Sequence, residues 1–296
     1  MSSHIGLIGY PIKHSISPYF QQAALDYYQL GVIYELWETT PEMLAPTVAK
    51  IREHKNLGAN VTVPHKEAVL PLLDEVDELA SSIGAVNTIV KKSDRLLGFN
   101  SDVYGFIEAL DKERHFKPQG KRVVILGAGG AARAVGFALV QKNANSLVII
   151  NRTFRRAQIL ADSLASYSND SSSGSETTKT KIATLPWKSL DSQATFSHCH
   201  LIINCTTMGM KHSSQEGQSP LSLEVIPRGI LVCDLIYNPW PTPLLALAEK
   251  AGADILGGLP MLVYQGAASF KLWTGKEAPV DIMFTKAKEI LTGGKE

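Results

Sequence analysis

An apolar strand, a glycine-rich turn and a helix of small residues follow one another near the middle of this chain. The strand Val123 to Leu126 runs into the turn Gly127-Ala128-Gly129-Gly130-Ala131-Ala132, and the small and apolar residues that follow predict a buried helix. Such a turn directs backbone N–H groups and the positive end of a helix at a pyrophosphate. The pattern predicts an α/β sheet with a dinucleotide site, in preference to a tight turn that binds nothing.

The next strand, Leu147 to Ile150, ends without the acidic residue that an NAD site places against the ribose hydroxyl groups. Asn151 and Arg152 stand there instead, and Arg155 and Arg156 follow closely. A guanidinium group suits a phosphate, whereas a carboxylate suits a ribose hydroxyl. The sequence therefore favours NADP(H) over NAD.

Length and charge limit the remaining possibilities. With 296 residues, 45% of them hydrophobic, the chain can bury the cores of two domains, and its net charge of +1 gives no field that would recruit nucleic acid or a membrane. Three cysteines without a Cys-x-x-Cys pair fit free thiols in a reducing cytoplasm. No basic and apolar leader precedes the first strand, and no apolar run is long enough to span a membrane, so a cytoplasmic protein is expected.

The first hundred residues alternate between strand-like and helix-like segments. Ser17 and Pro18 offer an N-cap and a first helical residue for a helix that ends near Gly31. Another helix is expected over 41–54, and strands are expected over 5–10, 33–38, 59–63 and 85–90. Because the glycine turn arrives only at residue 127, this upstream unit is predicted to be a separate domain.

The second half of the chain continues the parallel sheet. Strands are expected over 201–204, 230–233 and 253–256, and helices over 260–273 and 280–291. The polar stretch 167–181 has too little apolar area to order itself, so it is predicted to be a mobile surface loop. The last two helices are expected to return to the first domain.

Four polar clusters of the first domain lie, in order along the chain, between the first strand and its helix, at the end of a strand, on another strand and before a helix. They are Ser15-Ile16-Ser17, Asn60 to Lys66, Ala85 to Thr88 and Gly98 to Asp102. Their hydroxyl, amide, ammonium and carboxylate groups suit a hydroxylated ring that carries an acid. Each cluster also has a plain structural interpretation, since Ser17 can cap a helix, Asp102 can be an acid in a first helical turn, and Lys66 can be a solvated lysine.

Taken in order, these clusters and four later motifs closely resemble those of the shikimate dehydrogenase family. The later motifs are Asn151-Arg152-Thr153, Asn204-Cys205-Thr206-Thr207-Met208-Gly209-Met210, Asp234-Leu235-Ile236-Tyr237-Asn238-Pro239 and Gly258 to Gln265. The resemblance spans nearly the whole chain. Ser101, where the family more often has threonine, and the long polar stretch from Tyr167 depart from the pattern.

That resemblance implies reversible, NADPH-dependent reduction of 3-dehydroshikimate to shikimate in the pathway to chorismate and the aromatic amino acids. It implies that Lys66 and Asp102 are the acid/base pair. It also implies that shikimate is bound by Ser15, Ser17, Thr62, Lys66, Asn87, Asp102, Tyr237 and Gln265. The residues that it implies for NADP(H) are Glu78, Gly127, Ala128, Gly129, Gly130, Ala131, Asn151, Arg152, Thr153, Phe154, Arg155, Arg156, Leu235 and Gly258.

The predicted fold is α/β with two domains and a cleft between them. Residues 1–104 form an N-terminal α/β substrate domain, on which the C-terminal helices 266–296 pack, and residues 105–265 form a Rossmann-like, doubly wound NADP-binding domain. A homodimer is an expectation from the family resemblance. The partners are then the small-molecule substrate and NADP(H), with no nucleic acid and no membrane.

Several alternatives stay open at this stage. A quinate/shikimate dehydrogenase with relaxed substrate or cofactor use and a non-catalytic NADP(H)-binding regulatory module fit the same fold. The joint presence of Lys66 and Asp102 favours the enzyme, but either residue can be the formal base. No metal is predicted, because His198-Cys199-His200 has adjacent ligands and no complementary cluster.

Overall fold

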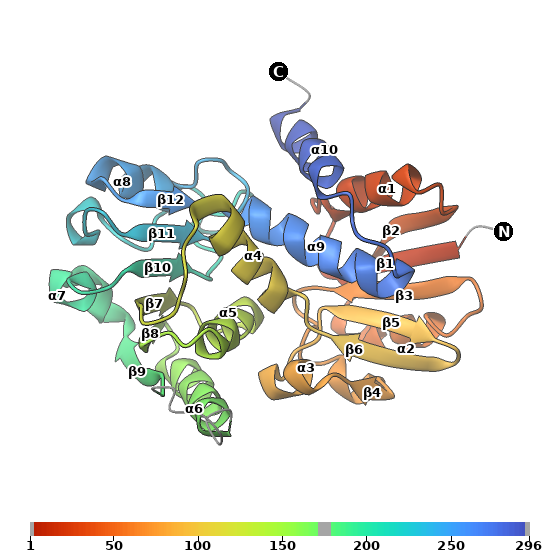
Figure 1. Cartoon of the computed structure of the whole chain (residues 1–296), viewed down its shortest axis with the longest axis horizontal. Helices are drawn as coiled ribbons and strands as arrows, with labels where there is room; N and C mark the ends of the chain where they lie inside the picture. Colours follow the sequence, from red (N-terminus) through yellow and green to blue (C-terminus); the bar gives the residue numbers. More distant parts are fainter. Residues whose placement is uncertain (1–2, 171–178, 294–296) are drawn as a thin grey trace. The chain divides into compact units, whose positions relative to one another are not determined.

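The computed structural model describes residues 3–170 and 179–293 and divides the chain into two compact units. The first unit comprises Met1–Gly105 and Leu262–Glu296, and the second comprises Phe106–Met261. In the described part of the chain, each unit contains one six-stranded sheet (Figure 1). None of the described helices is long and apolar enough to span a membrane.

The sheet of the first unit is mixed, with strand order β2-β1-β3-β5-β6-β4. β1 is parallel to both of its neighbours, whereas β5 runs antiparallel to β3 and β6. The strands are β1 (Ser3–Gly9), β2 (Val32–Glu38), β3 (Asn56–Val61), β4 (Glu75–Val76), β5 (Thr88–Lys92) and β6 (Arg95–Phe99). The helices that begin or end in this unit are α1 (Ser17–Tyr27), α2 (Leu44–Lys50), α3 (Glu78–Ile83), α4 (Asp102–Arg114), α9 (Gly258–Thr274) and α10 (Val280–Thr292).

Apolar residues from both faces of this sheet are buried. One core cluster joins Ile8, Val61 and Ile89 of the strands to Leu44, Val48 and Ile51 of the α2 region. α10 packs against α1 (Figure 1), and Gln21 of α1 donates a hydrogen bond of 2.9 Å to the carbonyl of Gly266 in α9. The C-terminal helices thus pack within this unit.

Local details of the first unit differ from the sequence prediction. The predicted N-cap Ser17 is wrong: Ile16 holds the cap position without a side-chain hydrogen bond, and Ser17 is the first helical residue. The predicted helix 41–54 is a short 3₁₀ turn, Pro41–Met43, followed by α2. The predicted strand 85–90 begins only at Thr88. The residues before it form a loop, in which the N–H of Val86 donates to the carbonyl of Lys66 and the N–H of Asn87 donates to the carbonyl of Phe99.

The sheet of the second unit is entirely parallel, with strand order β12-β11-β10-β7-β8-β9 (Figure 1). This is the doubly wound order, so the predicted fold class is confirmed. The strands are β7 (Arg122–Leu126), β8 (Ser146–Asn151), β9 (Lys181–Pro186), β10 (Leu201–Asn204), β11 (Leu231–Asp234) and β12 (Asp254–Leu256). The helices are α5 (Gly130–Gln141), α6 (Phe154–Asp170), α7 (Gln193–Phe196) and α8 (Pro243–Ala251).

The predicted loop 167–181 is wrong at both of its ends. α6 continues to Asp170, and the ring of Tyr167 packs against Phe137 of α5 at a centroid distance of 4.9 Å. β9 begins at Lys181, next to a buried Thr180. The amphipathic face of α6 extends further than the polar composition suggested, and the remainder of the predicted loop, residues 171–178, lies outside the described residues.

Candidate active site

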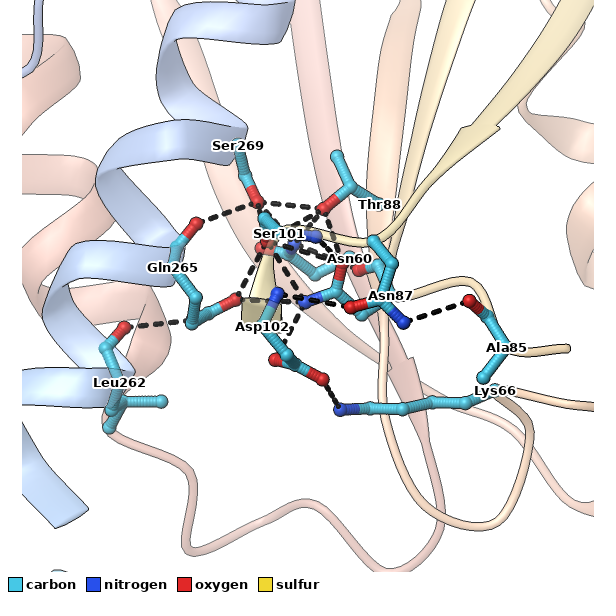
Figure 2. A network of polar contacts seen from close by, with 11 residues as sticks. Asn60, Lys66, Ala85, Asn87, Thr88, Ser101, Asp102, Leu262, Gln265 and Ser269 are labelled. Atoms are coloured by element: carbon cyan, nitrogen blue, oxygen red, sulfur yellow. Dashed lines mark hydrogen bonds and ion pairs between the residues drawn. The ribbon is translucent and has the colours of Figure 1, made fainter. Parts of the chain in front are cut away.

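Lys66 and Asp102 form a short ion pair, with the ammonium nitrogen 2.6 Å from Oδ2 of the carboxylate (Figure 2). The side chains are 16% and 7% exposed, so the pair is largely removed from water but still accessible on the lysine side. A charge-assisted bond of this length is strong and directional. The structure thus brings together the two residues predicted as the acid/base pair.

The backbone on either side of this pair is fixed by local hydrogen bonds. The ring of His65 is buried and lies 2.7 Å from the carbonyl oxygen of Thr39, and the N–H of Val86 donates to the carbonyl of Lys66 at 2.8 Å. Asp102 is the first residue of α4, and its N–H donates to Oδ1 of Asn100 at 3.1 Å. The pair therefore rests on ordered backbone rather than on free loops.

Asn87 donates a hydrogen bond to the second carboxylate oxygen of Asp102, the one that does not contact Lys66. Its Nδ2 donates to Oδ1 of Asp102 at 2.8 Å and to Oε1 of Gln265 at 3.2 Å (Figure 2). Its Oδ1 accepts the backbone N–H of Ser101 at 2.7 Å. Because a backbone N–H can only donate, that bond fixes which way the amide faces. Four predicted site residues, Lys66, Asn87, Asp102 and Gln265, are thus joined directly.

Ser15, Ser17 and Thr62 lie outside this network: Ser15 is in the loop between β1 and α1, Ser17 is the first residue of α1, and Thr62 follows β3. Oγ of Ser15 accepts the backbone N–H of Ser17 at 3.3 Å, and the N–H of Thr62 donates to the carbonyl of Ile8 at 2.8 Å. The methyl group of Thr62 lies where a Cβ on Gly9 would have to go. Ser15 and Thr62 are partly exposed, and Ser17 is buried.

The glycine turn of the second unit begins where β7 ends, at the point where the strand order reverses between β7 and β10. Gly127 has φ +110°, and a Cβ there would lie 3.1 Å from the carbonyl of Cys205 after β10. A Cβ on Gly129, which precedes the first residue of α5, would meet no atom within 4 Å. The first glycine thus makes the tight turn, and the second leaves open space at a helix N-terminus that suits an anion.

The residues after β8 present cationic side chains to solvent. Arg152, Arg155 and Arg156 are exposed, and in residues 3–170 and 179–293 none of the three pairs with a carboxylate. Nδ2 of Asn151 donates to the carbonyl of Thr153 at 2.9 Å and closes the turn into α6. Thr153 and Phe154 are also exposed. This segment fits a phosphate, because its guanidinium groups have no internal acid to satisfy them.

Leu235 and Gly258 are in close contact in the second unit. A Cβ on Gly258 would lie 2.0 Å from the carbonyl oxygen of Leu235, so only glycine permits this approach at the start of α9. Tyr237, on the same loop, is partly buried, and burial raises the pKa of its phenol. Glu78 lies in the first unit as the first residue of α3, which Asp77 caps, and its side chain is exposed.

Asp234 holds the loop that carries Leu235 and Tyr237. It accepts hydrogen bonds from Nδ2 of Asn204 at 3.0 Å, the N–H of Ile236 at 3.1 Å and the hydroxyl of Thr242 at 2.7 Å. Burial nevertheless raises the pKa of Asp234 to about 6. The folded protein therefore holds a proton on this carboxyl group in a pH range where the unfolded chain has lost it.

The raised pKa of Asp234 predicts a pH-dependent contribution to stability. This contribution is full below pH 4 and falls as the pH rises through 6, because the unfolded chain then ionises more readily. Between pH 5 and pH 7 the free energy of unfolding should fall by about 1 kcal/mol relative to the Asp234→Asn variant. Urea unfolding midpoints of both proteins at the two pH values measure it. Parallel shifts in the two proteins would contradict the assignment.

The cysteines and the histidine motif play no visible part in this chemistry. All three cysteines are free thiols, and burial raises the pKa of Cys199 to about 11. His198-Cys199-His200 leads into β10, and Nδ1 of His200 accepts the backbone N–H of Arg122 at 3.1 Å. No group of three or more potential ligands able to hold a metal occurs in the part of the chain that the structure describes.

Sequence reasoning missed several members of the polar network around Asn87. Asn60, Thr88 and Ser101 belong to quoted motifs but received no site role, and Tyr34 and Ser269 were not singled out. Ser269 lies one helical turn after Gln265 in α9, and its hydroxyl touches three side chains of the network. The spacing of four residues was the available signal, because residues i and i+4 share a helix face.

A doubly wound sheet with a dinucleotide turn in one unit, together with a buried lysine and aspartate pair in a separate α/β unit, defines a two-domain nicotinamide-dependent oxidoreductase. Sequence comparison narrows this class. The family model of the shikimate dehydrogenase substrate binding domain matches residues 7–89, that of shikimate / quinate 5-dehydrogenase matches residues 109–180, and that of the shikimate 5'-dehydrogenase C-terminal domain matches residues 258–283.

Individual relatives agree with these matches. The shikimate dehydrogenase (NADP(+)) of Methanopyrus kandleri is 42% identical over 280 residues, which cover 94% of this chain and 92% of that protein. The chain belongs to the shikimate dehydrogenase family. The solved structure of the enzyme from Thermus thermophilus with NADP(H) and shikimate is 34% identical, with a TM-score of 0.83 and coverage of 97% and 99% of the two chains. Quinate dehydrogenase from Corynebacterium glutamicum with NAD is 29% identical, with a TM-score of 0.83 and coverage of 96% and 98%.

Proposed function

We propose that this protein catalyses the reversible, NADPH-dependent reduction of 3-dehydroshikimate to shikimate in the biosynthesis of chorismate and the aromatic amino acids. The observation that carries the proposal is the Lys66–Asp102 ion pair, 2.6 Å long and tied by Asn87 to Gln265, in a chain of this family. A module that only binds a cofactor has no need of a buried, hydrogen-bonded acid/base pair. Burying such a pair costs desolvation free energy, so its presence favours a function that uses it.

The polar groups of the first unit suit shikimate, a ring with one carboxylate and several hydroxyl groups. In our proposal the hydroxyl groups of Ser15, Ser17 and Thr62 donate to the carboxylate, and the phenol of Tyr237 joins them. The raised pKa of Tyr237 keeps its proton available for donation. Lys66, Asn87, Asp102 and Gln265 bind the ring hydroxyl groups, since together they offer both donors and acceptors.

The second unit holds NADP(H) in this proposal. Gly127, Ala128, Gly129, Gly130 and Ala131 surround the pyrophosphate at the N-terminus of α5, where the open space beside Gly129 fits such a group. The 2′-phosphate lies among Asn151, Arg152, Thr153, Phe154, Arg155 and Arg156. Glu78, Leu235 and Gly258 lie at the nicotinamide end. When bound, the oxidised nicotinamide supplies a hydride acceptor.

Lys66 and Asp102 move the proton that accompanies the hydride. Oxidation of the alcohol breaks its C–H and O–H bonds, and the hydroxyl proton must pass to a base as the carbonyl forms. The pair accepts that proton at a carboxylate oxygen of Asp102, or at Nζ of Lys66 once the lysine has given up its own proton, so either residue can be the formal base. In the reducing direction the Lys66 ammonium stabilises the charge that develops on the oxygen.

The proposal also covers the role of each domain, the cellular compartment and the oligomeric state. The substrate is assigned to residues 1–104 with the C-terminal helices 266–296, and the cofactor to residues 105–265. A cytoplasmic location fits the three free thiols of the described chain. A homodimer is proposed from the family alone.

Purified protein tests this function directly. With shikimate and NADP⁺, the absorbance of the reduced nicotinamide should rise as NADPH and 3-dehydroshikimate form. With NAD⁺ the reaction should be far slower, because NAD⁺ has no 2′-phosphate for the arginines after β8 to bind. Rates with quinate and either cofactor distinguish the two enzymes of the family: a quinate/shikimate dehydrogenase oxidises quinate as well, and a shikimate-specific enzyme does not. Tight NADPH binding without turnover of either acid would instead favour a regulatory module.

A further inference from the structure

Ser269 is a fully buried serine on α9 whose hydroxyl group meets three other parts of the first unit (Figure 2). Its Oγ lies 3.0 Å from Nδ2 of Asn60 at the end of β3, 2.8 Å from the hydroxyl of Thr88 in β5 and 3.0 Å from the hydroxyl of Ser101 before α4. It also lies 3.1 Å from the carbonyl of Gln265 in its own helix. Ser269 therefore links α9 to the segments that carry the catalytic pair.

The direction of the bond between Asn60 and Ser269 follows from the neighbours of Asn60. Nδ2 of Asn60 donates to the carbonyl of Asn87 at 3.0 Å, and the carbonyl oxygen of the same amide accepts the phenol of Tyr34 at 2.8 Å. Burial raises the pKa of Tyr34, so this phenol keeps its proton and donates. The amide nitrogen of Asn60 then donates its other hydrogen to Ser269, whose hydroxyl accepts it.

Thr88, Ser101 and Ser269 form a closed triangle of hydroxyl groups. The third side, between Thr88 and Ser101, is 3.2 Å long. Thr88 and Ser101 also lie 3.0 and 3.1 Å from Oδ1 of Asn87, to which each can donate. The Ser269 hydroxyl group lies within hydrogen-bond distance of both hydroxyl groups that can donate to Oδ1 of Asn87. A buried network of this kind is rigid while every member is satisfied.

We propose that Ser269 is a positioning residue that acts through Asn87 on Asp102. Without the Ser269 hydroxyl group, Nδ2 of Asn60 keeps the Asn87 backbone carbonyl but loses its acceptor on α9, and Thr88 and Ser101 are free to turn away from Oδ1 of Asn87. The Asn87 amide then holds Oδ1 of Asp102 less firmly, and the carboxylate departs from the geometry that aims it at Lys66 and the substrate. The inference rests on the proposed dehydrogenase function.

Ser269→Ala tests the inference, because the change removes one oxygen atom and adds no bulk. With shikimate and NADP⁺, kcat should fall about tenfold while KM for NADP⁺ stays within about twofold, since only the positioning of the reacting groups is lost. Thr274→Ala is the matched control. Thr274 makes the same kind of hydroxyl bond to the carbonyl four residues before it, at 2.8 Å on the same helix, without touching the network, so its kcat should stay within about twofold.

A double-mutant cycle separates positioning from general loosening of the fold. In an Asn87→Ala background, Ser269→Ala should lower kcat by less than about twofold further, because its route to Asp102 is already cut. Full additivity, an equal loss in Thr274→Ala, or normal kcat in Ser269→Ala would overturn the inference. If Ser269→Ala does not fold, Thr88→Val tests the same triangle at constant volume and should show the tenfold loss, and two unfolded variants would make the triangle a folding requirement instead.

The wild-type protein separates failure of this inference from failure of the proposed function. A wild-type enzyme that turns over shikimate while Ser269→Ala is unaffected overturns the role of Ser269 alone. A wild-type protein that binds NADPH but turns over no shikimate overturns both.

Discussion

Replacing Lys66 by alanine should lower kcat for shikimate oxidation by about 1000-fold, within the usual range for loss of a group that moves a proton in the transition state. KM for shikimate should change much less, because the hydrogen-bonded Asn87, Asp102 and Gln265 remain to bind the ring in the proposed site. The loss should be of similar size in the reducing direction, where the ammonium group stabilises the developing alkoxide. Steady-state kinetics in both directions measure the effect.

Lys286→Ala is the control for loss of one ion-paired lysine. Lys286 lies on α10 in the same unit and pairs with Glu289 at 2.8 Å, but both side chains are about half exposed. A surface pair of this kind contributes about 0–1 kcal/mol, so kcat should be unchanged. An unchanged kcat in Lys66→Ala would rule out the proposed role of Lys66. A rise in KM alone would make Lys66 a binding residue only.

The dinucleotide unit could be predicted well because its fold is written in local sequence. The strand before Gly127, the alanines after it and the loss of the acid at Asn151 each follow from short-range rules on strands, turns and helix starts. Gly258, by contrast, was implied only by the family resemblance, and the structure shows that the close approach of the Leu235 carbonyl requires glycine there. A parallel sheet leaves few other ways to connect such units.

The first unit was less predictable because its sheet depends on pairings distant in sequence. β5 and β6 form an antiparallel hairpin of five-residue strands, and only the first of them was expected. The hydroxyl triangle joins residues up to 181 positions apart, so no local pattern reveals it. Lys66 and Asp102 were recognisable through family motifs, whereas the length of their ion pair and the contact between Ser101 and Ser269 are visible only in the folded chain.

Replacing Arg152 by alanine should raise KM for NADPH by about 10- to 100-fold, the loss expected when a charge-assisted bond to a phosphate disappears. KM for NADH should change by less than about twofold, because NADH has no 2′-phosphate for Arg152 to bind. The KM of Arg152→Lys for NADPH should lie between those of the wild type and Arg152→Ala, since lysine keeps the charge but lacks the planar donor fork. Initial rates of the wild type and both variants with each cofactor, at saturating 3-dehydroshikimate, give the six KM values.

The difference between the two cofactors is the decisive quantity in this experiment. Lys250→Ala removes a positive charge from an exposed site on α8 and should leave both KM values unchanged, so it controls for the overall charge of the unit. Equal losses with NADPH and NADH in Arg152→Ala would instead show that Arg152 supports the turn between β8 and α6. A selective loss places the 2′-phosphate at this turn, because Asn151 leaves no carboxylate there to bind a free ribose hydroxyl group.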